Sequence, residues 1–404
     1  MVALTAPGQT AAVSMFIDPV IADLGISRSA VSTAYLVGTL TGALAMPLVG
    51  RTLDRFGARR VVVVIGLVFG GTLCALSAVS SVVGLTAGFV AIRMAGQGAL
   101  GLAATTVVAL WFDRRRGTAL GLVSAIGASA ISLTPVLLEV LVSDWGWRRA
   151  WLAEGVVVLA VVLPVAWFAL RDRPADLGQQ PDGATLHDDE PPAPQWGVPR
   201  GMALRTPFFW VVTAGVAARG LLSTAINFHQ ISLLTARGLT ATAAAANFLP
   251  QTAATLVATL ATGFLVDRMR SQPLVALCMA ALLGALVLGT WVTPGLSAVL
   301  FGLLLGAAGG GMRTLEAATF PRYFGTRHLG GIRGVVVSVS VGSTAFGPVL
   351  FATLHDLTGS YTPALLLAAP VPLAIAVAAL LIRPPTIDAA DEPVVANADA
   401  RPAD

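Results

Sequence analysis

Long, uninterrupted apolar segments are the feature of this 404-residue chain that most restricts its fold. A helix needs about 20 mainly apolar residues to cross the roughly 30 Å hydrocarbon core of a bilayer. We count twelve such segments, at residues 2–22, 29–50, 61–81, 84–110, 117–142, 148–170, 207–233, 241–266, 273–292, 295–320, 334–355 and 362–382. The runs do not alternate with polar residues, which excludes a membrane β-barrel. Because a helix satisfies its own backbone hydrogen bonds, the sequence predicts an all-α integral membrane protein with twelve transmembrane helices.

Composition supports this prediction and excludes other classes. Hydrophobic residues make up 56% of the chain and charged residues 11%, against roughly 25% charged in soluble domains. The sequence has no phosphate-binding loop, no metal-ligand spacing among its His and Cys residues, and no catalytic triad in a loop. We therefore expect no enzyme activity, cofactor or metal. Because the arginines are dispersed between apolar runs, we expect no nucleic-acid partner either.

The distribution of basic residues predicts the orientation. All 25 basic residues are arginines, and most lie in alternate loops and near the C-terminus. Since cytoplasmic loops carry the excess of positive charge, these loops are predicted to be cytoplasmic, together with both termini. The use of arginine alone, with abundant Ala and Gly, is typical of a GC-rich bacterial genome. We expect a multi-pass protein of a bacterial cytoplasmic membrane that acts as a monomer.

The one long polar stretch between predicted spans divides the chain. Residues 171–206 are rich in proline and acidic residues, which predicts a cytoplasmic linker. It separates two predicted six-helix bundles, at residues 1–170 and 207–383. The tail, residues 384–404, is rich in Pro, Ala and Asp and is predicted to be disordered.

The two halves also repeat each other. Residues 50–55, with the pattern Gly-x-x-x-Asp-Arg, recur at 263–268, and Pro-Val-Leu at 135–137 recurs at 348–350, both at a shift of 213 residues. Both halves have the same orientation, so the repeat is parallel and predicts a pseudo-two-fold axis along the membrane normal, as in secondary transporters. Span seven begins near Pro207, which corresponds to a position before Met1. We therefore expect the native chain to begin upstream of Met1.

A motif between predicted spans two and three carries a family resemblance. Residues 50–60 read Gly-Arg-Thr-Leu-Asp-Arg-Phe-Gly-Ala-Arg-Arg. This segment resembles the G-x-x-x-D-R-x-G-x-R-R signature of the major facilitator superfamily, and the likeness extends over the whole chain. Residues 24–28, 111–117, 146–148 and 171–174 further resemble bacterial members related to monocarboxylate and oxalate/formate porters. The resemblance implies a secondary active transporter that works by alternating access.

In that family the motif latches the cytoplasmic ends of the two halves in the outward-facing state. Glycine permits close helix approach, and a carboxylate at a helix end favours an arginine partner. The resemblance therefore implies a conformational latch formed by Gly50, Asp54, Arg55, Gly57, Arg59, Asp267 and Arg268. The alternative is a basic segment that only anchors the topology.

Ionisable residues inside spans are costly in lipid and are candidates for function. Arg93 lies roughly 14 Å into span four and Arg219 roughly 18 Å into span seven, both near the midplane. By the family resemblance, spans one, four, seven and ten line the central cavity. The predicted substrate or coupling residues are Arg93, Arg219, Gln97, Asn227, Gln251, Arg313 and Glu316. Alternatively, the two midplane arginines form structural charge pairs and Arg313 extends to the membrane surface.

A planar guanidinium favours a carboxylate partner, so the leading prediction is transport of a small organic anion. Residues 241–266 and 334–355 contain no Arg or Lys, whereas the narrower porter families carry a basic residue in span eight or eleven. The alternative is a proton-coupled drug or metabolite efflux antiporter, because Arg-x-x-Gly-x-Gly at 93–98 resembles the span-four motif of such proteins. A third hypothesis is a non-transporting sensor of the same fold. Expected partners are a small solute, the bilayer and, as a candidate coupling ion, the proton.

Overall fold

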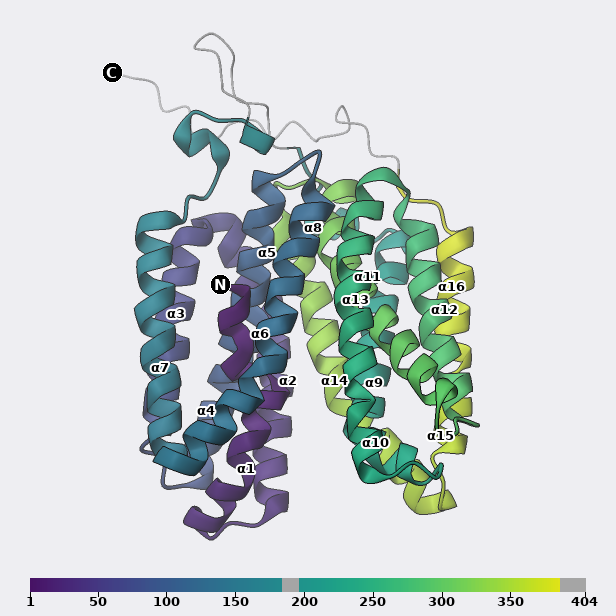
Figure 1. Ribbon diagram of the computed structural model, residues 1–404. Coiled ribbons are helices and arrows are strands. Elements are labelled where there is room, and N and C mark those ends of the chain that lie inside the picture. The colour runs from purple at the N-terminus through teal and green to yellow at the C-terminus, as the bar shows by residue number, and fades with distance from the viewer. Residues whose placement is uncertain (184–195, 386–404) are drawn as a thin grey trace, which may run out of the picture.

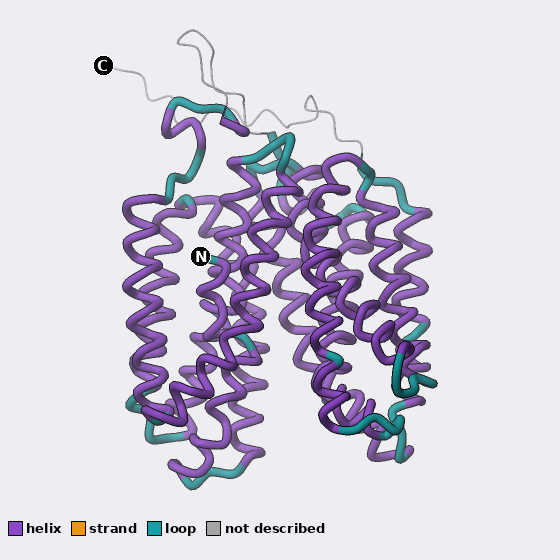
Figure 2. Tube along the Cα trace, in the orientation of Figure 1, coloured by secondary structure: helices purple, strands orange, loops and turns teal. Residues whose placement is uncertain are grey.

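The computed structural model describes residues 1–183 and 196–385. These residues are helical with short connections, and their only β-type pairing is an isolated bridge between Gly197 and Gly325 (Figures 1 and 2). The tail that the sequence predicts to be disordered, residues 384–404, lies outside the described residues except for 384 and 385. The first half contains η1 (Val2–Gly8), α1 (Thr10–Leu24), α2 (Arg28–Phe56), α3 (Ala58–Leu76), α4 (Val82–Ile92), η2 (Arg93–Ala99), α5 (Leu100–Trp111), α6 (Arg116–Trp145), α7 (Trp147–Pro164) and η3 (Val165–Ala169).

The described parts of the linker and the second half are also helical. The linker holds three short helical turns, η4 (Pro174–Leu177), η5 (Pro181–Gly183) and α8 (Arg200–Ala203). The second half contains α9 (Pro207–Thr235), α10 (Ala241–Ala246), α11 (Phe248–Arg268), α12 (Ser271–Gly289), α13 (Leu296–Phe324), α14 (Leu329–Thr358), α15 (Thr362–Ala368) and α16 (Pro370–Leu381).

The predicted all-α membrane architecture is confirmed. Eleven helices of the described chain are long and apolar enough to cross a membrane. The first predicted span is divided into η1 and α1, and α1 is only 15 residues long. Together these two elements occupy the place of the remaining, sixth helix of the first bundle (Figure 1).

The two halves form separate bundles with largely separate apolar cores. In the first core Phe16 stacks on Trp151 at 4.5 Å, and in the second Phe209 packs against Phe320 at 5.4 Å. Between the bundles, α2 packs against α14 and α6 packs against α11. These two contacts exchange under the 213-residue repeat, which confirms the parallel pseudo-two-fold arrangement.

Two predicted helix boundaries are wrong, and both errors matter for the site. The helix α14 begins at Leu329 rather than at 334, so Arg333 lies inside it. The helix α2 continues to Phe56, so most of the motif that the sequence placed in a loop is helical. The break comes at Gly57, whose φ of +81° is a backbone conformation that glycine adopts without strain.

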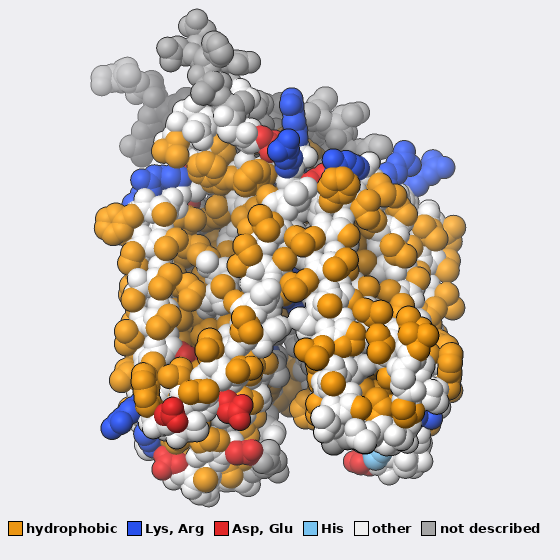
Figure 3. All heavy atoms as spheres, viewed as in Figure 1, with side chains coloured by type: hydrophobic (Ala, Val, Ile, Leu, Met, Phe, Trp, Pro, Cys, Tyr) orange, Lys and Arg blue, Asp and Glu red, His pale blue; other side chains and the backbone are white. Residues whose placement is uncertain are grey.

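The outer surface is apolar along most of its height (Figure 3). Large exposed side chains such as Leu44, Phe168 and Leu296 cover it, as lipid-facing residues do. Arginines gather at the end that carries the linker, which we call the linker side. A notch separates the two halves at the opposite end (Figure 3).

Candidate functional site

A carboxylate joins the two bundles on the linker side. Asp54, near the end of α2, accepts hydrogen bonds from the backbone N–H groups of Gly330 at 2.7 Å and Gly331 at 2.6 Å. Both donors belong to the first turn of α14. The first N–H groups of a helix have no partner within the helix and carry partial positive charge, so an anionic acceptor is favoured there.

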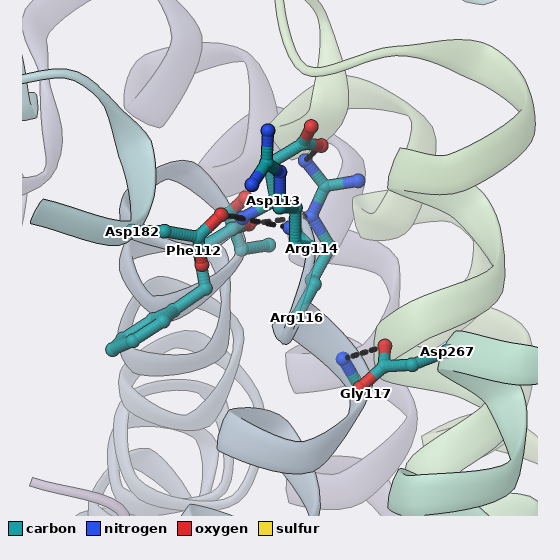
Figure 4. Close-up of polar contacts among 8 residues, drawn as sticks. Phe112, Asp113, Arg114, Arg116, Gly117, Asp182 and Asp267 are labelled. Atoms are coloured by element: carbon teal, nitrogen blue, oxygen red, sulfur yellow. Dashed lines mark hydrogen bonds and ion pairs between the residues drawn. The ribbon is translucent and has the colours of Figure 1, made fainter. Parts of the chain in front are cut away.

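The repeat produces the same contact at the other interface. Asp267, near the end of α11, accepts from the backbone N–H groups of Gly117 at 2.6 Å and Thr118 at 2.9 Å (Figure 4). The Thr118 hydroxyl donates to the same carboxylate at 2.8 Å. Asp54 and Asp267 therefore clamp helix N-termini of the opposite bundle, and we call these two contacts the carboxylate clamps.

Glycine is needed where the clamps bring backbones together. A Cβ atom on Gly50 would collide with the carbonyl oxygen of Gly330. At the second interface, a Cβ on Gly117 would lie 2.5 Å from the Gly263 carbonyl oxygen, and a Cβ on Gly263 would lie 2.6 Å from the Gly117 carbonyl oxygen. These distances are too short for any side chain, so the clamps require glycine.

The arginines of the predicted latch contact their own bundle. The Arg55 guanidinium lies 5.1 Å from the ring centroid of Phe56. The backbone N–H of Arg59 donates to Asp172 at 2.7 Å, and its side chain donates to the Trp167 carbonyl at 2.6 Å. The acidic partner of this segment is thus Asp172, at the start of the linker.

The arginine of the predicted latch in the second half also contacts its own bundle. The Arg268 guanidinium lies 3.4 Å from the ring centroid of Phe264, in its own helix. Of the predicted latch, the structure therefore brings only Asp54, Asp267 and Gly50 to the interface. The expected Asp–Arg pair is replaced by a carboxylate bound to helix N–H groups. Gly57 serves instead as the turn between α2 and α3, against Asp172.

A cavity of about 370 Å³ lies between the bundles. Its charged lining residues are Arg219 on α9, Arg313 and Glu316 on α13, and Arg333 on α14, all in the second half. The first half contributes neutral groups only, among which the polar side chains are Thr5, Gln9, Thr10, Gln97, Thr105 and Ser124.

Two of the cavity arginines have incomplete hydrogen bonding. Arg219 donates from Nη2 to the Ser340 hydroxyl at 3.4 Å. Arg333 is buried and donates from Nη1 to the Thr105 hydroxyl of the first bundle at 2.8 Å. The Nε groups of both arginines are buried without a hydrogen-bond partner in the described residues. Such donors are costly to leave unpaired.

Glu316 is the one acidic side chain among the described residues that line this cavity. It interacts electrostatically with Arg219, Arg313 and Arg333, but within the described chain no ion pair of 4.0 Å or less joins it to any of them. Arg313 and Glu316, three residues apart on α13, therefore do not form a direct ion pair. Arg313 and Arg219 are close enough to repel each other. The cavity lining holds three positive groups and one negative group.

Arg93 lies elsewhere. It is 1% exposed and does not line the cavity. Its Nε donates to the Thr39 hydroxyl at 3.1 Å and its Nη1 to the Gly8 carbonyl at 3.0 Å, while its guanidinium lies 4.7 Å from the Tyr35 ring centroid. These contacts hold η1 and α2 on η2 inside the first bundle. The contacts of Arg93 therefore lie within the first bundle, and its partners are neutral groups and not the carboxylate expected in the structural alternative.

Of the three neutral residues predicted to bind substrate, one lines the cavity and two do not. Gln97 lines the cavity, and its Oε1 atom is buried with no hydrogen-bond partner in the part of the chain that the structure describes. Gln251 donates to the Asn227 side chain at 2.8 Å, which joins α11 to α9. Neither Asn227 nor Gln251 lines the cavity.

Arg333 is the functional candidate that sequence reasoning missed. The predicted eleventh span begins at residue 334, which leaves Arg333 just outside it. The repeat held the signal that corrects this boundary. At the shift of 213 residues, Arg333 corresponds to Leu120, which lies inside the predicted fifth span at 117–142.

The described ends of the linker touch both bundles near the clamps. The Asp182 carboxylate accepts from the backbone N–H groups of Asp113 at 3.2 Å and Arg114 at 2.8 Å (Figure 4). After the undescribed residues 184–195, the Val198 N–H donates to the Phe324 carbonyl at 3.0 Å. The described ends of the linker therefore lie on the same side of the molecule as the two carboxylate clamps.

Two clamped helical bundles around a central charged cavity define a membrane transporter of the two-bundle class. The sequence model of the Major Facilitator Superfamily matches residues 1–288, and the chain belongs to this family. It is a multi-pass membrane transporter and not an enzyme.

Relatives and solved structures agree with this assignment. The MFS transporter asaE of Aspergillus flavus is 26% identical over 326 residues, which cover 78% of this chain and 69% of that protein. The oxalate:formate antiporter of Oxalobacter formigenes is 28% identical over 205 residues, which cover 49% and 45%. The structure of the MFS transporter FucP in the outward conformation aligns with a TM-score of 0.69 at 14% identity, over 95% of this chain and 96% of that one. This last similarity concerns the fold.

Proposed function

We propose that this protein is a secondary active transporter that moves a small organic anion across a bacterial cytoplasmic membrane by alternating access. The observation that supports the proposal is the charge of the central cavity, where Arg219, Arg313 and Arg333 face a single carboxylate. Buried charge in a membrane protein is costly unless it is paired. A bound anion would supply the missing negative charge and would accept hydrogen bonds from the two unpartnered Nε groups.

The clamps support the conformational part of the proposal. Asp54 and Asp267 hold the bundles together on the linker side, while a notch lies between the halves at the other end (Figure 3). We place the linker side in the cytoplasm because most arginines lie there. In this assignment the structure is outward-facing, and inward opening requires that both carboxylates leave their helix N-termini.

Uptake into proteoliposomes tests the proposal. The wild-type protein is assayed with radiolabelled carboxylates, and Arg219→Gln and Arg333→Gln are compared with it. A hydrogen bond to a charged group contributes about 1.5–3 kcal/mol, so each variant should lose at least about tenfold in apparent affinity. Arg383→Gln, which removes an exposed arginine beyond α16, is the matched control and should transport normally. Unchanged uptake by the Arg219→Gln/Arg333→Gln double variant would exclude the anion site.

Efflux by proton antiport is the second candidate, and Glu154 favours it. This residue of α7 is buried, and both of its carboxylate oxygens lack a hydrogen-bond partner among the described residues. A carboxyl group of this kind can hold a proton inside the membrane. If efflux is the function, cells that express Glu154→Gln should lose resistance to a cationic drug that wild-type protein confers. The positive cavity opposes this reading, because it repels cations.

A further inference from the structure

We infer that the substrate of the central cavity is a compact dianion with its two negative charges on separate acid groups. The inference rests on the proposed function, since it assumes that the cavity binds an anion. It goes further by specifying the charge of that anion and how the charge is divided.

The charge of the lining gives the first argument. Three guanidinium groups and the Glu316 carboxylate leave two positive charges uncompensated. Arg93 does not enter this count, because its guanidinium is enclosed by Thr39, Gly8 and Tyr35 within the first bundle. A dianion brings the lining to neutrality, whereas a monoanion leaves one buried charge unpaired. Leaving one charge of a buried set uncompensated is strongly unfavourable.

The unpartnered donors give the second argument, which is independent of the charge count. One buried Nε group belongs to Arg219 on α9 and the other to Arg333 on α14. Arg219 reaches α14 at Ser340, seven residues beyond Arg333, which corresponds to about 10 Å along the helix axis. Two arginines whose contact positions on α14 lie this far apart fit two separate acid groups better than one carboxylate.

The size and the neutral lining restrict the anion further. A cavity of about 370 Å³ is near the lower end of the range of about 300–1,000 Å³ for small-molecule sites. The opposite wall comes from the first bundle and is neutral, with the unpartnered Oε1 of Gln97 as an acceptor. This wall suits the short, uncharged middle of a diacid, including one with a hydroxyl group.

The experiment compares ligands of nearly equal size and different charge. Binding of malonate, succinate and glutarate to the full-length purified protein at pH 7 is measured by isothermal titration calorimetry, beside the monomethyl ester of each diacid. We expect at least one diacid to bind ten or more times more tightly than its monoester. Two charge variants sharpen the test. Arg313→Gln lowers the excess charge to one and should reduce the diacid-to-monoester ratio at least threefold, whereas Glu316→Gln should not reduce it.

The outcomes separate the two proposals. If monoesters bind as tightly as the diacids, the dianion inference is wrong but the anion transporter stands. If none of these anions or their esters binds, and none is taken up by proteoliposomes, the proposed function fails as well. Should Arg313→Gln not fold, as judged by size-exclusion chromatography, the wild-type panel and Glu316→Gln still decide between these outcomes.

Discussion

The carboxylate clamp at Asp54 makes a quantitative prediction about the conformational balance. Its two oxygens accept hydrogen bonds of 2.7 and 2.6 Å from the first turn of α14. The substitution Asp54→Asn keeps the size of the side chain and one oxygen acceptor. It removes the negative charge and turns the second oxygen into an N–H donor, which faces another donor. The clamp therefore loses one hydrogen bond and the charge of the other.

The size of this loss follows from the contacts. A hydrogen bond to a charged group contributes about 1.5–3 kcal/mol net, and a neutral one about 1 kcal/mol. The interaction of a carboxylate with a helix N-terminus adds about 0.3–1 kcal/mol. Because Asp54 is only half-buried, we take the low end and expect about 2 kcal/mol in favour of linker-side opening. This energy corresponds to roughly a 30-fold change in the equilibrium between the two states.

Hydrogen–deuterium exchange measures the change directly, because the two clamped N–H groups belong to Gly330 and Gly331. Exchange of a peptide that contains them should accelerate roughly 30-fold in Asp54→Asn. Asp172→Asn is the matched control, since Asp172 accepts from the Arg59 N–H within one bundle and should leave this peptide unchanged. If Asp54→Asn exchanges at the wild-type rate, or if Asp172→Asn accelerates the same peptide equally, the clamp does not hold the bundles together.

Three further predictions concern neighbouring contacts. Gly117→Val should prevent linker-side closure, because its side chain would collide with the Gly263 backbone; spin-label distances across the notch should then shorten, and unchanged distances would contradict the close-packing argument. Arg93→Gln should lower the thermal unfolding midpoint while it leaves ligand preference unchanged, since this residue lies outside the cavity; a changed preference in calorimetry would place it in the site. Thr105→Val should weaken anion binding less than about threefold, because Arg333 loses only a neutral partner; a loss as large as that of Arg333→Gln would mean that Thr105 itself binds the ligand.

The sequence predicted the helices well because hydropathy reports directly on the lipid environment. It could not predict the partner of Asp54, since Gly330 lies 276 residues away and offers only backbone N–H groups. The family resemblance instead predicts an arginine as the partner, because a sequence identifies side chains, whereas backbone N–H groups occur at almost every residue and leave no signal. Depth along a helix likewise placed Arg93 near the midplane, but depth does not reveal which face of the helix a residue occupies.

The 213-residue repeat separates what could be predicted from what could not. The clamps obey the repeat, because it relates Asp54 to Asp267 and Gly117 to Gly330. The charged cavity residues break it, since their counterparts in the first half are buried and apolar. These pairs are Arg219 and Ala6, Arg313 and Leu100, Glu316 and Ala103, and Arg333 and Leu120. The contacts that both halves need for packing and opening can therefore be predicted from the internal repeat. The binding site cannot be predicted in this way, because an asymmetric solute bound between two similar halves requires only one half to carry the charge.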